Sequence, residues 1–296
     1  MTPQQPQQMR AIVHDEYGSP DVLRISEVDK PRAGDDDVLV RVHAASVNPY
    51  DWHMMTGKPY LVRLQNGFRR PKQQSPGVDV SGVVVAVGKD VTGLAIGDEV
   101  FGTGHGAYAE FVVASGDRVV PKPENVTFVQ AAAVPMAAIT ALQSLRDKGQ
   151  IRAGHKVLVN GASGGVGSFA VQIAKSFGAE VTGVCSTRNV DMVRSIGADH
   201  VIDYTQQDFT RSDQQYHLIL DMVGNHSLRK YRRALTPKGI YVSAGWENKR
   251  NWIQPLTRMA KVLFASLIGR QKMVGMLARF NHPDLIILAE LLESGA

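Results

Sequence analysis

The sequence is poor in the residues that staple small folds together or bind structural metals. Cys185 is the single cysteine among 296 residues, which excludes a disulfide framework. One thiolate also cannot supply the several sulfur ligands of a structural zinc site. No apolar run approaches the roughly 20 residues that a membrane-spanning helix needs. We therefore expect a cytoplasmic protein with no membrane span and no thiolate-bound metal.

The sequence also lacks a large excess of charge of one sign. The 33 Lys and Arg residues against 28 Asp and Glu residues leave a formal net charge of +5. This mild excess favours anionic ligands but is too small to indicate a nucleic-acid-binding protein, so no nucleic-acid partner is expected. Residues 1–8 form a polar tail rich in Gln and Pro, without the charged-then-apolar pattern of a secretion signal. We expect this tail to be disordered.

Residues 9–125 are typical of a domain of short β-strands. Gly and Pro recur at short intervals and separate apolar runs, as in a small, irregular barrel. Strands are expected at Val38–Val42, Val83–Val87, Gly97–Gly102 and Tyr108–Val113. After Pro123 the sequence becomes Ala-rich and helical from Thr127 to about Leu145, with a break at Pro135. We place the domain boundary close to Val126.

Residues 126–296 alternate between strand and helix patterns. Apolar strand candidates occur at Lys156–Asn160, Glu180–Val184, His200–Ile202, Leu218–Asp221 and Ile240–Ser243. Helical patterns fall between them at Val166–Phe177, Asn189–Ile196 and Ser227–Leu235. Strands and helices that alternate with short connections predict a parallel α/β sheet with helices on both faces, a doubly wound fold.

A glycine-rich turn joins the first of these strands to its helix. It consists of Gly161, Ala162, Ser163, Gly164, Gly165, Val166 and Gly167. Backbone N–H groups at a helix N-terminus, with no Cβ in the way, bind a pyrophosphate. Measured against G-x-G-x-x-G, alanine replaces the first glycine, at Ala162. The strand before it and the helix after it favour a dinucleotide site over the alternative, a plain tight turn.

The second strand of such a fold ends where the adenosine ribose binds. An NAD-binding protein usually has Asp or Glu there to accept the 2′-OH. This sequence has Ser186, Thr187 and Arg188 instead, and the segment 185–189 carries no carboxylate. Two hydroxyls and a guanidinium can donate to a 2′-phosphate, so NADPH is favoured over NADH. The alternative is that Arg188 is simply a solvated residue at a helix start.

Five blocks of the sequence resemble the medium-chain dehydrogenase/reductases, in the zinc-independent quinone oxidoreductase-like and enoyl reductase-like branch. They are Val47–Trp52, Pro76–Gly82, Gly97–Val100, the glycine-rich turn and Gly197–Tyr204. The resemblance implies a GroES-like β-barrel domain for substrate and catalysis over residues 9–125. It implies a Rossmann NADPH-binding domain over residues 126–296. Relatives continue with a segment that returns to the barrel, which we expect to be absent here because the sequence ends at Ala296.

The resemblance also implies which further residues contact the cofactor. Tyr204 would join Ser186, Thr187 and Arg188 at the 2′-phosphate. Asn48 would lie near the nicotinamide and Thr140 near its ribose. The segments that follow two later strands would line the cofactor through Val223, Ser243 and Gly245.

Zinc-dependent members of the superfamily carry a Cys early in the barrel domain and a Gly-His-Glu in the next block. The corresponding places here are Asn48–Asp51 and Gly77-Val78-Asp79. We therefore expect no metal site. Without a Lewis acid, reduction of a simple ketone loses its electrophilic assistance. Quinones and α,β-unsaturated carbonyls need only hydrogen-bond donors and a proton, so they are the expected substrates.

Enoyl reductases that resemble this chain use a tyrosine in the general stretch that contains Tyr60, so the resemblance implies that Tyr60 is the proton donor. Asn48 is the second expected catalytic residue. An aromatic packed at the edge of a domain is the alternative interpretation of Tyr60.

Two other functions compete with this hypothesis: an aldehyde or alcohol dehydrogenase of the same superfamily, and a non-catalytic NADPH-binding or RNA-associated protein. The basic segments Phe68–Lys72 and Arg229–Arg233 would serve the RNA-associated function, although solvated surfaces explain them better. The basic, amphipathic stretch Arg258–Arg270 suggests contact with a membrane surface or, preferably, a helix that packs over the cleft or against a neighbouring subunit. We expect a homodimer.

Overall fold

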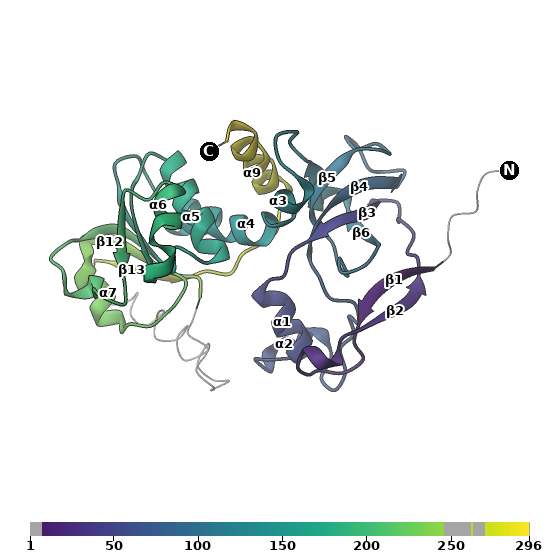
Figure 1. The fold of residues 1–296 in the computed structure, drawn as a ribbon, viewed down its shortest axis with the longest axis horizontal. Coiled ribbons are helices and arrows are strands. Elements are labelled where there is room, and N and C mark those ends of the chain that lie inside the picture. Colours follow the sequence, from purple (N-terminus) through teal and green to yellow (C-terminus); the bar gives the residue numbers. More distant parts are fainter. Residues whose placement is uncertain (1–7, 246–261, 263–269, 296) are drawn as a thin grey trace. The chain divides into compact units, whose positions relative to one another are not determined.

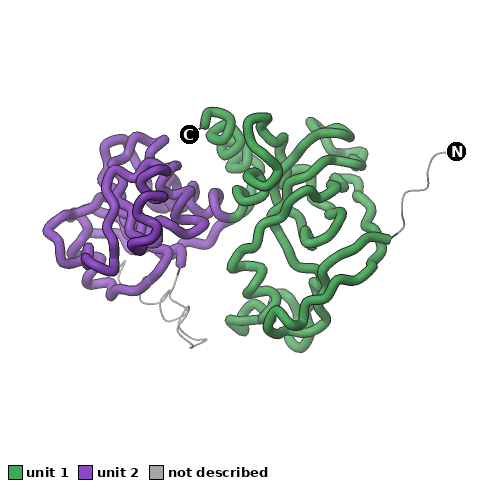
Figure 2. The backbone as a smooth tube through the Cα atoms, viewed as in Figure 1, with its two compact units in different colours: residues 1–136, 280–295 green, residues 137–279, 296 purple. Residues whose placement is uncertain are grey.

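The computed structural model describes residues 8–245, 262 and 270–295, which form two compact units (Figure 1). Unit 1 contains residues 1–136 and 280–295, and unit 2 contains residues 137–279 (Figure 2). Most of the expected tail lies outside the described residues, and Gln8 begins the first strand. The stretch Arg258–Arg270 also lies outside them, except for Val262 and Arg270.

Unit 1 is built from short antiparallel strands. A five-stranded sheet has the order β6-β3-β4-β5-β7, and β1 and β2 pair as a separate ribbon. The strands are β1 (Gln8–Val13), β2 (Arg24–Asp29), β3 (Asp37–Ala45), β4 (Asp79–Val87), β5 (Glu99–Thr103), β6 (Phe111–Ser115) and β7 (Val119–Pro121). Its core is dominated by valines, among them Val38, Val40, Val80 and Val84. Such β-branched side chains pack well on a pleated surface.

Helices complete unit 1. They are α1 (Pro49–Thr56), α2 (Leu61–Asn66), α3 (Phe128–Ala132) and α9 (His282–Ser294). The α1 helix starts at Asn48 because the Asp51 carboxylate accepts the Asn48 N–H at 2.8 Å and Pro49 occupies the first helical position. It ends at Gly57, which has the left-handed conformation.

Unit 2 is built around a six-stranded, fully parallel sheet with the order β10-β9-β8-β11-β12-β13. Its strands are β8 (Lys156–Asn160), β9 (Glu180–Cys185), β10 (His200–Asp203), β11 (Tyr216–Asp221), β12 (Leu235–Ser243) and β13 (Lys272–Gly275). In chain order within the sheet this is 3-2-1-4-5-6, the Rossmann order, so the predicted doubly wound sheet is confirmed.

Among the described residues of unit 2, α4 (Pro135–Gln143) precedes β8, and its first turn belongs to unit 1. The helices α5 (Gly165–Ser176), α6 (Val190–Ser195) and α7 (Leu228–Ala234) each connect two consecutive strands of the sheet. The predicted break at Pro135 is confirmed, since α3 and α4 are separate helices.

The division between the units differs from the expected boundary near Val126. Unit 1 extends to Met136 because α3 packs on β3 and β4. The chain also returns to unit 1 at its end, since α9 packs on β7 and the Asn125 side chain donates to the Leu292 carbonyl at 2.8 Å. Assigning every residue after 125 to the second domain is therefore wrong for α9.

Candidate active site

The glycine-rich turn follows β8 with the geometry of a dinucleotide-binding turn. Gly161 has φ of +93°, so it supplies the left-handed residue of the turn, and Ala162 can replace glycine at the next position. A Cβ on Gly167 would lie 2.0 Å from the Gly161 carbonyl oxygen. Only glycine therefore allows α5 to pack this closely against the strand end.

The start of α5 leaves room for a phosphate. Gly164 is the N-cap of α5, and a Cβ added to Gly165 would meet its nearest neighbour, Ala137, only at 4.0 Å. The first N–H groups of a helix have no partner within the helix and carry its positive dipole end. The Ser163 hydroxyl accepts a hydrogen bond from Asn189 at 3.1 Å, which ties the turn to the end of β9. Backbone donors beside open space fit the pyrophosphate of a dinucleotide.

Donors for a further anionic group gather at the carboxyl ends of β9 and β10. Ser186, Thr187 and Arg188 follow β9, and the Tyr204 N–H donates to the Cys185 carbonyl at 3.0 Å. The side chains of Thr187, Arg188 and Tyr204 are exposed. The structure thus brings together the four residues that the sequence assigned to the 2′-phosphate, and no ion pair engages Arg188 within the described part of the chain.

Asp203 at the end of β10 is a carboxylate that sequence reasoning missed. The segment 185–189 carries none, but parallel pairing places Asp203 opposite Cys185. The Thr187 hydroxyl donates to Asp203 at 2.6 Å, and this bond lowers the pKa of the carboxyl. Asp203 is therefore an ionised acceptor next to the predicted donors. A neighbouring strand supplies it, so position along the chain gave no signal for it.

A buried carboxylate shapes the loop after β11. Asp221 is fully buried, and its Oδ1 accepts the N–H groups of Val223 at 3.1 Å and Gly224 at 2.9 Å. Asn160 donates to the same oxygen at 2.8 Å, and the Tyr241 hydroxyl donates to Oδ2 at 2.6 Å. The carboxyl ends of β8, β11 and β12 are thereby tied together. Sequence reasoning missed this group, although an Asp that ends an apolar strand was a usable signal.

The remaining residues predicted at this edge lie on the same strand ends. The Ser243 hydroxyl donates to the Gly245 carbonyl at 3.3 Å, and a Cβ on Gly245 would lie 2.0 Å from the Met222 carbonyl oxygen. The segments that contain Val223 and Gly245 are therefore in close contact. Thr140 lies half-buried on α4.

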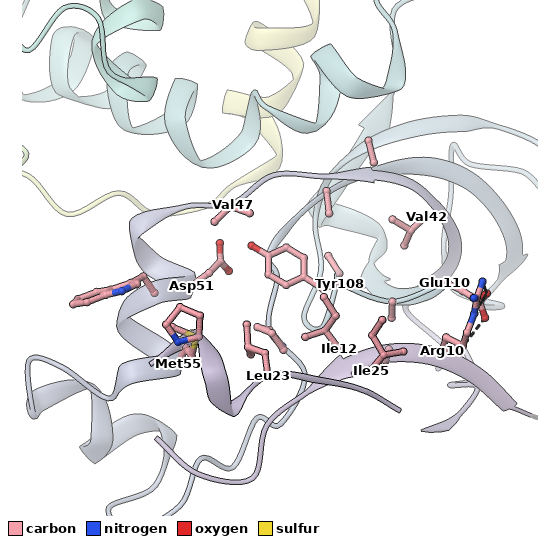
Figure 3. A pocket seen from close by; sticks show the side chains of 18 of the residues that line it. Arg10, Ile12, Leu23, Ile25, Val42, Val47, Asp51, Met55, Tyr108 and Glu110 are labelled. Atoms are coloured by element: carbon pink, nitrogen blue, oxygen red, sulfur yellow. Dashed lines mark hydrogen bonds and ion pairs between the residues drawn. The ribbon is translucent and has the colours of Figure 1, made fainter. Parts of the chain in front are cut away.

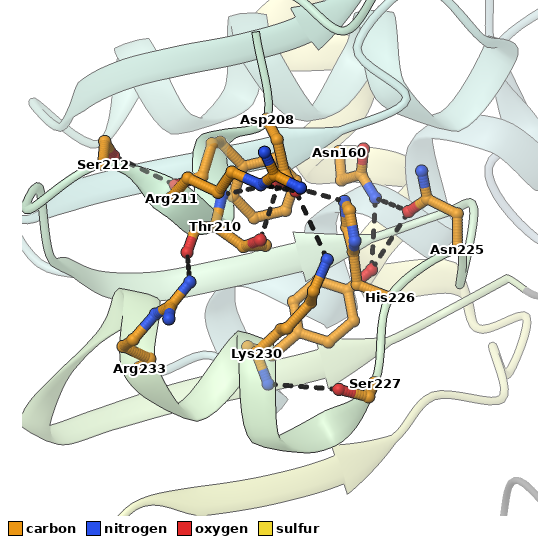
Figure 4. Close-up of polar contacts among 12 residues, drawn as sticks. Asn160, Asp208, Thr210, Arg211, Ser212, Asn225, His226, Ser227, Lys230 and Arg233 are labelled. Atoms are coloured by element: carbon orange, nitrogen blue, oxygen red, sulfur yellow. Dashed lines mark hydrogen bonds and ion pairs between the residues drawn. The ribbon is translucent and has the colours of Figure 1, made fainter.

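The basic segment Arg229–Arg233 is engaged within unit 2 (Figure 4). Lys230 donates to Asp208 at 3.3 Å, and Arg233 donates to the Thr210 carbonyl. Partial burial acts to raise the pKa of Asp208, but hydrogen bonds from Thr210 and Lys230 outweigh it and hold the pKa at about 2. These contacts account for Lys230 and Arg233 without a nucleic-acid ligand.

In unit 1, Asn48 belongs to a buried polar network. Its Nδ2 donates to Asp79 Oδ2 and to the Ser46 hydroxyl, both at 3.0 Å, and Ser46 donates to Asp79 at 2.9 Å. The Met136 N–H at the start of α4 also donates to Asp79, at 3.1 Å. Burial outweighs these donors and raises the pKa of Asp79 to about 7. The Asn48 amide is therefore held in a fixed orientation.

Tyr108 and Asp51 lie beside this network. The Tyr108 hydroxyl donates to the Ser46 carbonyl at 3.0 Å, and the Tyr108 ring lies where a Cβ on Gly77 would be. Burial raises the pKa of Asp51, although the Asn48 N–H and Tyr108 oppose the shift. Burial and the nearby carboxylates also raise the pKa of Tyr108, so its hydroxyl stays protonated at neutral pH.

A cavity of about 740 Å³ opens next to Tyr108 and Asp51 (Figure 3). We call it the unit 1 cavity. Figure 3 shows the Tyr108 hydroxyl and the Asp51 carboxyl pointing toward one another at one end, and the Arg10–Glu110 pair at the other. Its wall comes from β1, β2, β3, α1 and the segments around Pro76 and Tyr108.

Tyr60 lies apart from this cavity. It is the N-cap of α2, its side chain is 47% exposed, and the Arg63 guanidinium lies 4.9 Å from its ring centroid. Its assignment as proton donor stays a prediction.

Within the described residues, no three His, Cys, Asp or Glu side chains come together in a way that could hold a metal ion. Likewise, none of the helices in the described ranges is long and apolar enough to cross a membrane.

Two family models match the chain, one in each part. Residues 34–124 match the alcohol dehydrogenase GroES-like domain, and residues 165–281 match a model described as zinc-binding dehydrogenase. The GroES-like and Rossmann architecture expected from the sequence is therefore confirmed.

Relatives of known name cover much of the chain. It is 38% identical to the 2-methylene-furan-3-one reductase of Solanum lycopersicum over 74% of this chain and 58% of that protein. It is 34% identical to the quinone oxidoreductase of Homo sapiens over 88% of this chain and 79% of that protein. The solved quinone oxidoreductase of Coxiella burnetii superposes with a TM-score of 0.81 and 32% identity, over 97% of this chain and 88% of that one. The chain thus spans less than two thirds of the tomato reductase.

Proposed function

Because the chain belongs to the quinone oxidoreductase branch of the medium-chain dehydrogenase/reductase superfamily, we propose that it is an NADPH-dependent reductase of quinones or α,β-unsaturated carbonyls that uses no metal. The assignment of a nicotinamide dinucleotide as cofactor rests on relatives whose names include NAD(P)H and NADPH. The preference for NADPH rests on this chain's own residues.

The turn between β8 and α5 carries the proposal. It offers the backbone N–H of Gly165 next to open space, at the first position of α5, and Gly161 and Gly167 give it the shape of a dinucleotide-binding turn. Ser186, Thr187, Arg188 and Tyr204 stand one strand further along the sheet, where a 2′-phosphate would be bound. The guanidinium of Arg188 would supply the positive charge opposite the 2′-phosphate.

The residues at the family's catalytic zinc positions support a reaction without metal. The block that begins at Asn48 replaces the Cys, and Gly77-Val78-Asp79 replaces the Gly-His-Glu, so the apolar Val78 stands at the His position. Asn48 and Asp79 hydrogen-bond to each other at 3.0 Å. An amide engaged with a carboxylate and a hydroxyl is a poor set of ligands for zinc, which prefers Cys and His. The network instead presents a fixed amide at the position that the resemblance assigns to the nicotinamide.

Bound NADPH supplies a hydride, and the protein's residues determine where it goes. With a conjugated acceptor, hydride addition at the electrophilic carbon would move an electron pair to the carbonyl oxygen, which would take a proton to give an enol. A proton shift from oxygen to carbon would then give the saturated ketone from an enone, and a proton shift from the ring carbon to the second oxygen would give the hydroquinone from a quinone. The protein needs only to orient the acceptor, exclude water and provide a hydrogen-bond donor and a proton.

An NADPH-oxidation assay tests this proposal. Purified protein should consume NADPH with naphthoquinones and with enones, and the KM for NADH should be higher than that for NADPH. No oxidation with any conjugated acceptor, although NADPH binds, would favour a non-catalytic role. Reduction of aldehydes with metal-dependent rates would favour the aldehyde or alcohol dehydrogenase alternative.

A further inference from the structure

The unit 1 cavity exists because small side chains line it. Five of its lining residues are alanine: Ala11, Ala44, Ala45, Ala107 and Ala109. Methyl groups from two strands, β1 and β3, and from the loop before β6 leave space that larger apolar residues would fill. At about 740 Å³ the unit 1 cavity is within the range of small-molecule binding pockets.

The wall of the unit 1 cavity is mostly apolar and continues to the protein surface. Ile12, Leu23, Val42 and Met55 line it. Ile25 and Val47 also line it, and their side chains are 75% and 81% exposed. Large apolar side chains exposed around a hollow favour an apolar occupant, which would remove them from water.

Charge in the unit 1 cavity argues against an anionic occupant. Arg10 is paired with Glu110 through two hydrogen bonds between the side chains, of 2.9 and 3.1 Å. Asp51 is acidic, and the His43 ring stacks on Phe128 with the centroids 4.3 Å apart. The single Arg on the wall is thus already neutralised, and a carboxylate, sulfonate or phosphate on the occupant would find no counter-charge.

The polar end of the unit 1 cavity adjoins the Asn48 network. Asp51 lines the cavity, and its Oδ2 accepts the Asn48 N–H at 2.8 Å. The Tyr108 hydroxyl, which now donates to the Ser46 carbonyl at 3.0 Å, can rotate its hydrogen toward an acceptor in the cavity. One hydroxyl donor at the end of an apolar pocket suits a carbonyl oxygen.

We propose that the unit 1 cavity binds the apolar body of an uncharged quinone or enone, with the Tyr108 hydroxyl donating to its carbonyl oxygen. This inference rests on the proposed function for the identity of the ligand. The space, the apolar wall and the single donor define the ligand's class: neutral, bulky and carrying one accessible carbonyl.

Isothermal titration of the cofactor-free protein tests the proposal without turnover. The probes are 2-methyl-1,4-naphthoquinone, which is neutral, and 1,4-naphthoquinone-2-sulfonate, which is an anion of similar size. The neutral quinone should bind at least about ten-fold more tightly. Equal binding of both probes, or tighter binding of the sulfonate, would overturn the proposal.

Variants locate the binding. Ala44→Leu narrows the unit 1 cavity and should weaken binding of the neutral quinone by about ten-fold or more. Ala95→Leu enlarges an exposed alanine outside the cavity and should bind as the wild type does. Ile25→Gln changes a rim position that is 75% exposed, so it should weaken quinone binding without affecting folding. It therefore tests the cavity even if Ala44→Leu is unstable. Tyr108→Phe should weaken binding several-fold. Wild-type affinity in Ala44→Leu and Ile25→Gln would overturn the proposal.

Parallel measurements separate this inference from the proposed function. The Kd for NADPH should be the same in all four variants, because none of the four positions is among the residues expected to contact the cofactor. Quinone binding that responds to the variants in a protein that never oxidises NADPH would support the pocket and contradict the reductase. Turnover with wild-type KM values for the quinone in every variant would contradict the pocket and leave the reductase standing.

Discussion

At the scale of single residues, one buried carboxylate in each unit holds donors in place. Asp221 fixes the loop after β11 in unit 2, and Asp79 fixes Asn48, Ser46 and the start of α4 in unit 1. Both are fully buried. Asp79 has no cationic partner in its network, only neutral donors, which is why burial can raise its pKa to about 7.

The pKa of Asp79 predicts a pH-dependent stability. The folded-state value of about 7 lies above the unfolded value near 4, so the folded protein retains a proton that the unfolded chain has lost. This contribution is fully present below about pH 4 and is lost as the pH rises toward 7. It amounts to no more than about 4 kcal/mol, since one pKa unit corresponds to about 1.4 kcal/mol.

Urea denaturation at several pH values measures this effect. In Asp79→Asn the free energy of unfolding should rise relative to wild type between pH 4 and about 7. Asp208→Asn is the control, because the pKa of Asp208 is held at about 2 and its removal should leave the slope above pH 5 unchanged. Parallel profiles for wild type and Asp79→Asn would show that Asp79 ionises normally in the folded protein.

Arg188 should decide which cofactor is preferred. Its exposed guanidinium stands at the end of β9, and losing a hydrogen bond to a charged group is worth about 1.5–3 kcal/mol. Arg188→Ala should therefore raise the KM for NADPH by about ten- to hundred-fold and leave the KM for NADH nearly unchanged. The ionised Asp203 nearby strengthens the test, because it can accept a ribose hydroxyl of NADH. An equal loss for both cofactors would mean that Arg188 has only a structural role.

Tyr60 gives a separate test of the predicted proton donor. If it protonates the product, Tyr60→Phe should lower kcat by about ten-fold or more, as general-acid groups contribute at least that much. Tyr50→Phe is a matched control on α1, where the side chain is 38% exposed. Steady-state kinetics with a saturating quinone measure both variants, and an unchanged kcat in Tyr60→Phe would remove Tyr60 from the mechanism.

At the scale of elements, two glycines of the same turn should respond in opposite ways to alanine. Gly167→Ala places a Cβ 2.0 Å from the Gly161 carbonyl oxygen, so it should lower the melting temperature of the cofactor-free protein. Gly165→Ala meets nothing closer than 4.0 Å and replaces glycine in a helix, where alanine is preferred by about 1 kcal/mol. Gly165→Ala should therefore leave the stability equal or higher. It should weaken NADPH binding by about ten-fold, because the Cβ enters the space expected for the phosphate.

Thermal unfolding and fluorescence titration of NADPH measure the two effects independently. Gly165→Ala with wild-type affinity for NADPH would show that the turn binds no phosphate, whatever its shape.

Local patterns explain which elements could be predicted from the sequence. The β8 strand, its turn and α5 follow each other directly, so apolar periodicity and glycine placement predict them within a residue or so. The ribbon of β1 and β2 was not predicted, because most of its β2 residues are half-exposed or exposed and the strand lacks a strong apolar run. The return of α9 to unit 1 depends on tertiary packing, which periodicity does not report.

The residues of the candidate site likewise divide into those that local sequence predicts and those that only folding brings together. The glycine-rich turn and the donors after β9 are each contiguous in sequence, so they could be predicted. Asp79 is 31 positions from Asn48, and Asp203 is 16 positions from Thr187. Only folding brings such partners together, so their contacts and the pKa of Asp79 were not predictable. Alanines scattered from Ala11 to Ala109 likewise gave no sign of the unit 1 cavity.

At the scale of the whole molecule, each unit contributes one part of the proposed reaction. Unit 2 provides the dinucleotide-binding sheet edge. Unit 1 provides the Asn48 network and the unit 1 cavity, with neutral hydrogen-bond donors where zinc-dependent relatives have ligands. The central proposal is therefore that the protein reduces a conjugated carbonyl with NADPH and without metal.

A matched pair of substrates tests that claim most directly. 1-Octen-3-one and 3-octanone share a carbon skeleton and differ only in conjugation. After treatment with a chelator, the protein should oxidise NADPH with 1-octen-3-one, yield 3-octanone as the product and leave added 3-octanone unreduced. Reduction of 3-octanone to the alcohol at a comparable rate, or activity that disappears on chelation and returns with zinc, would contradict the account.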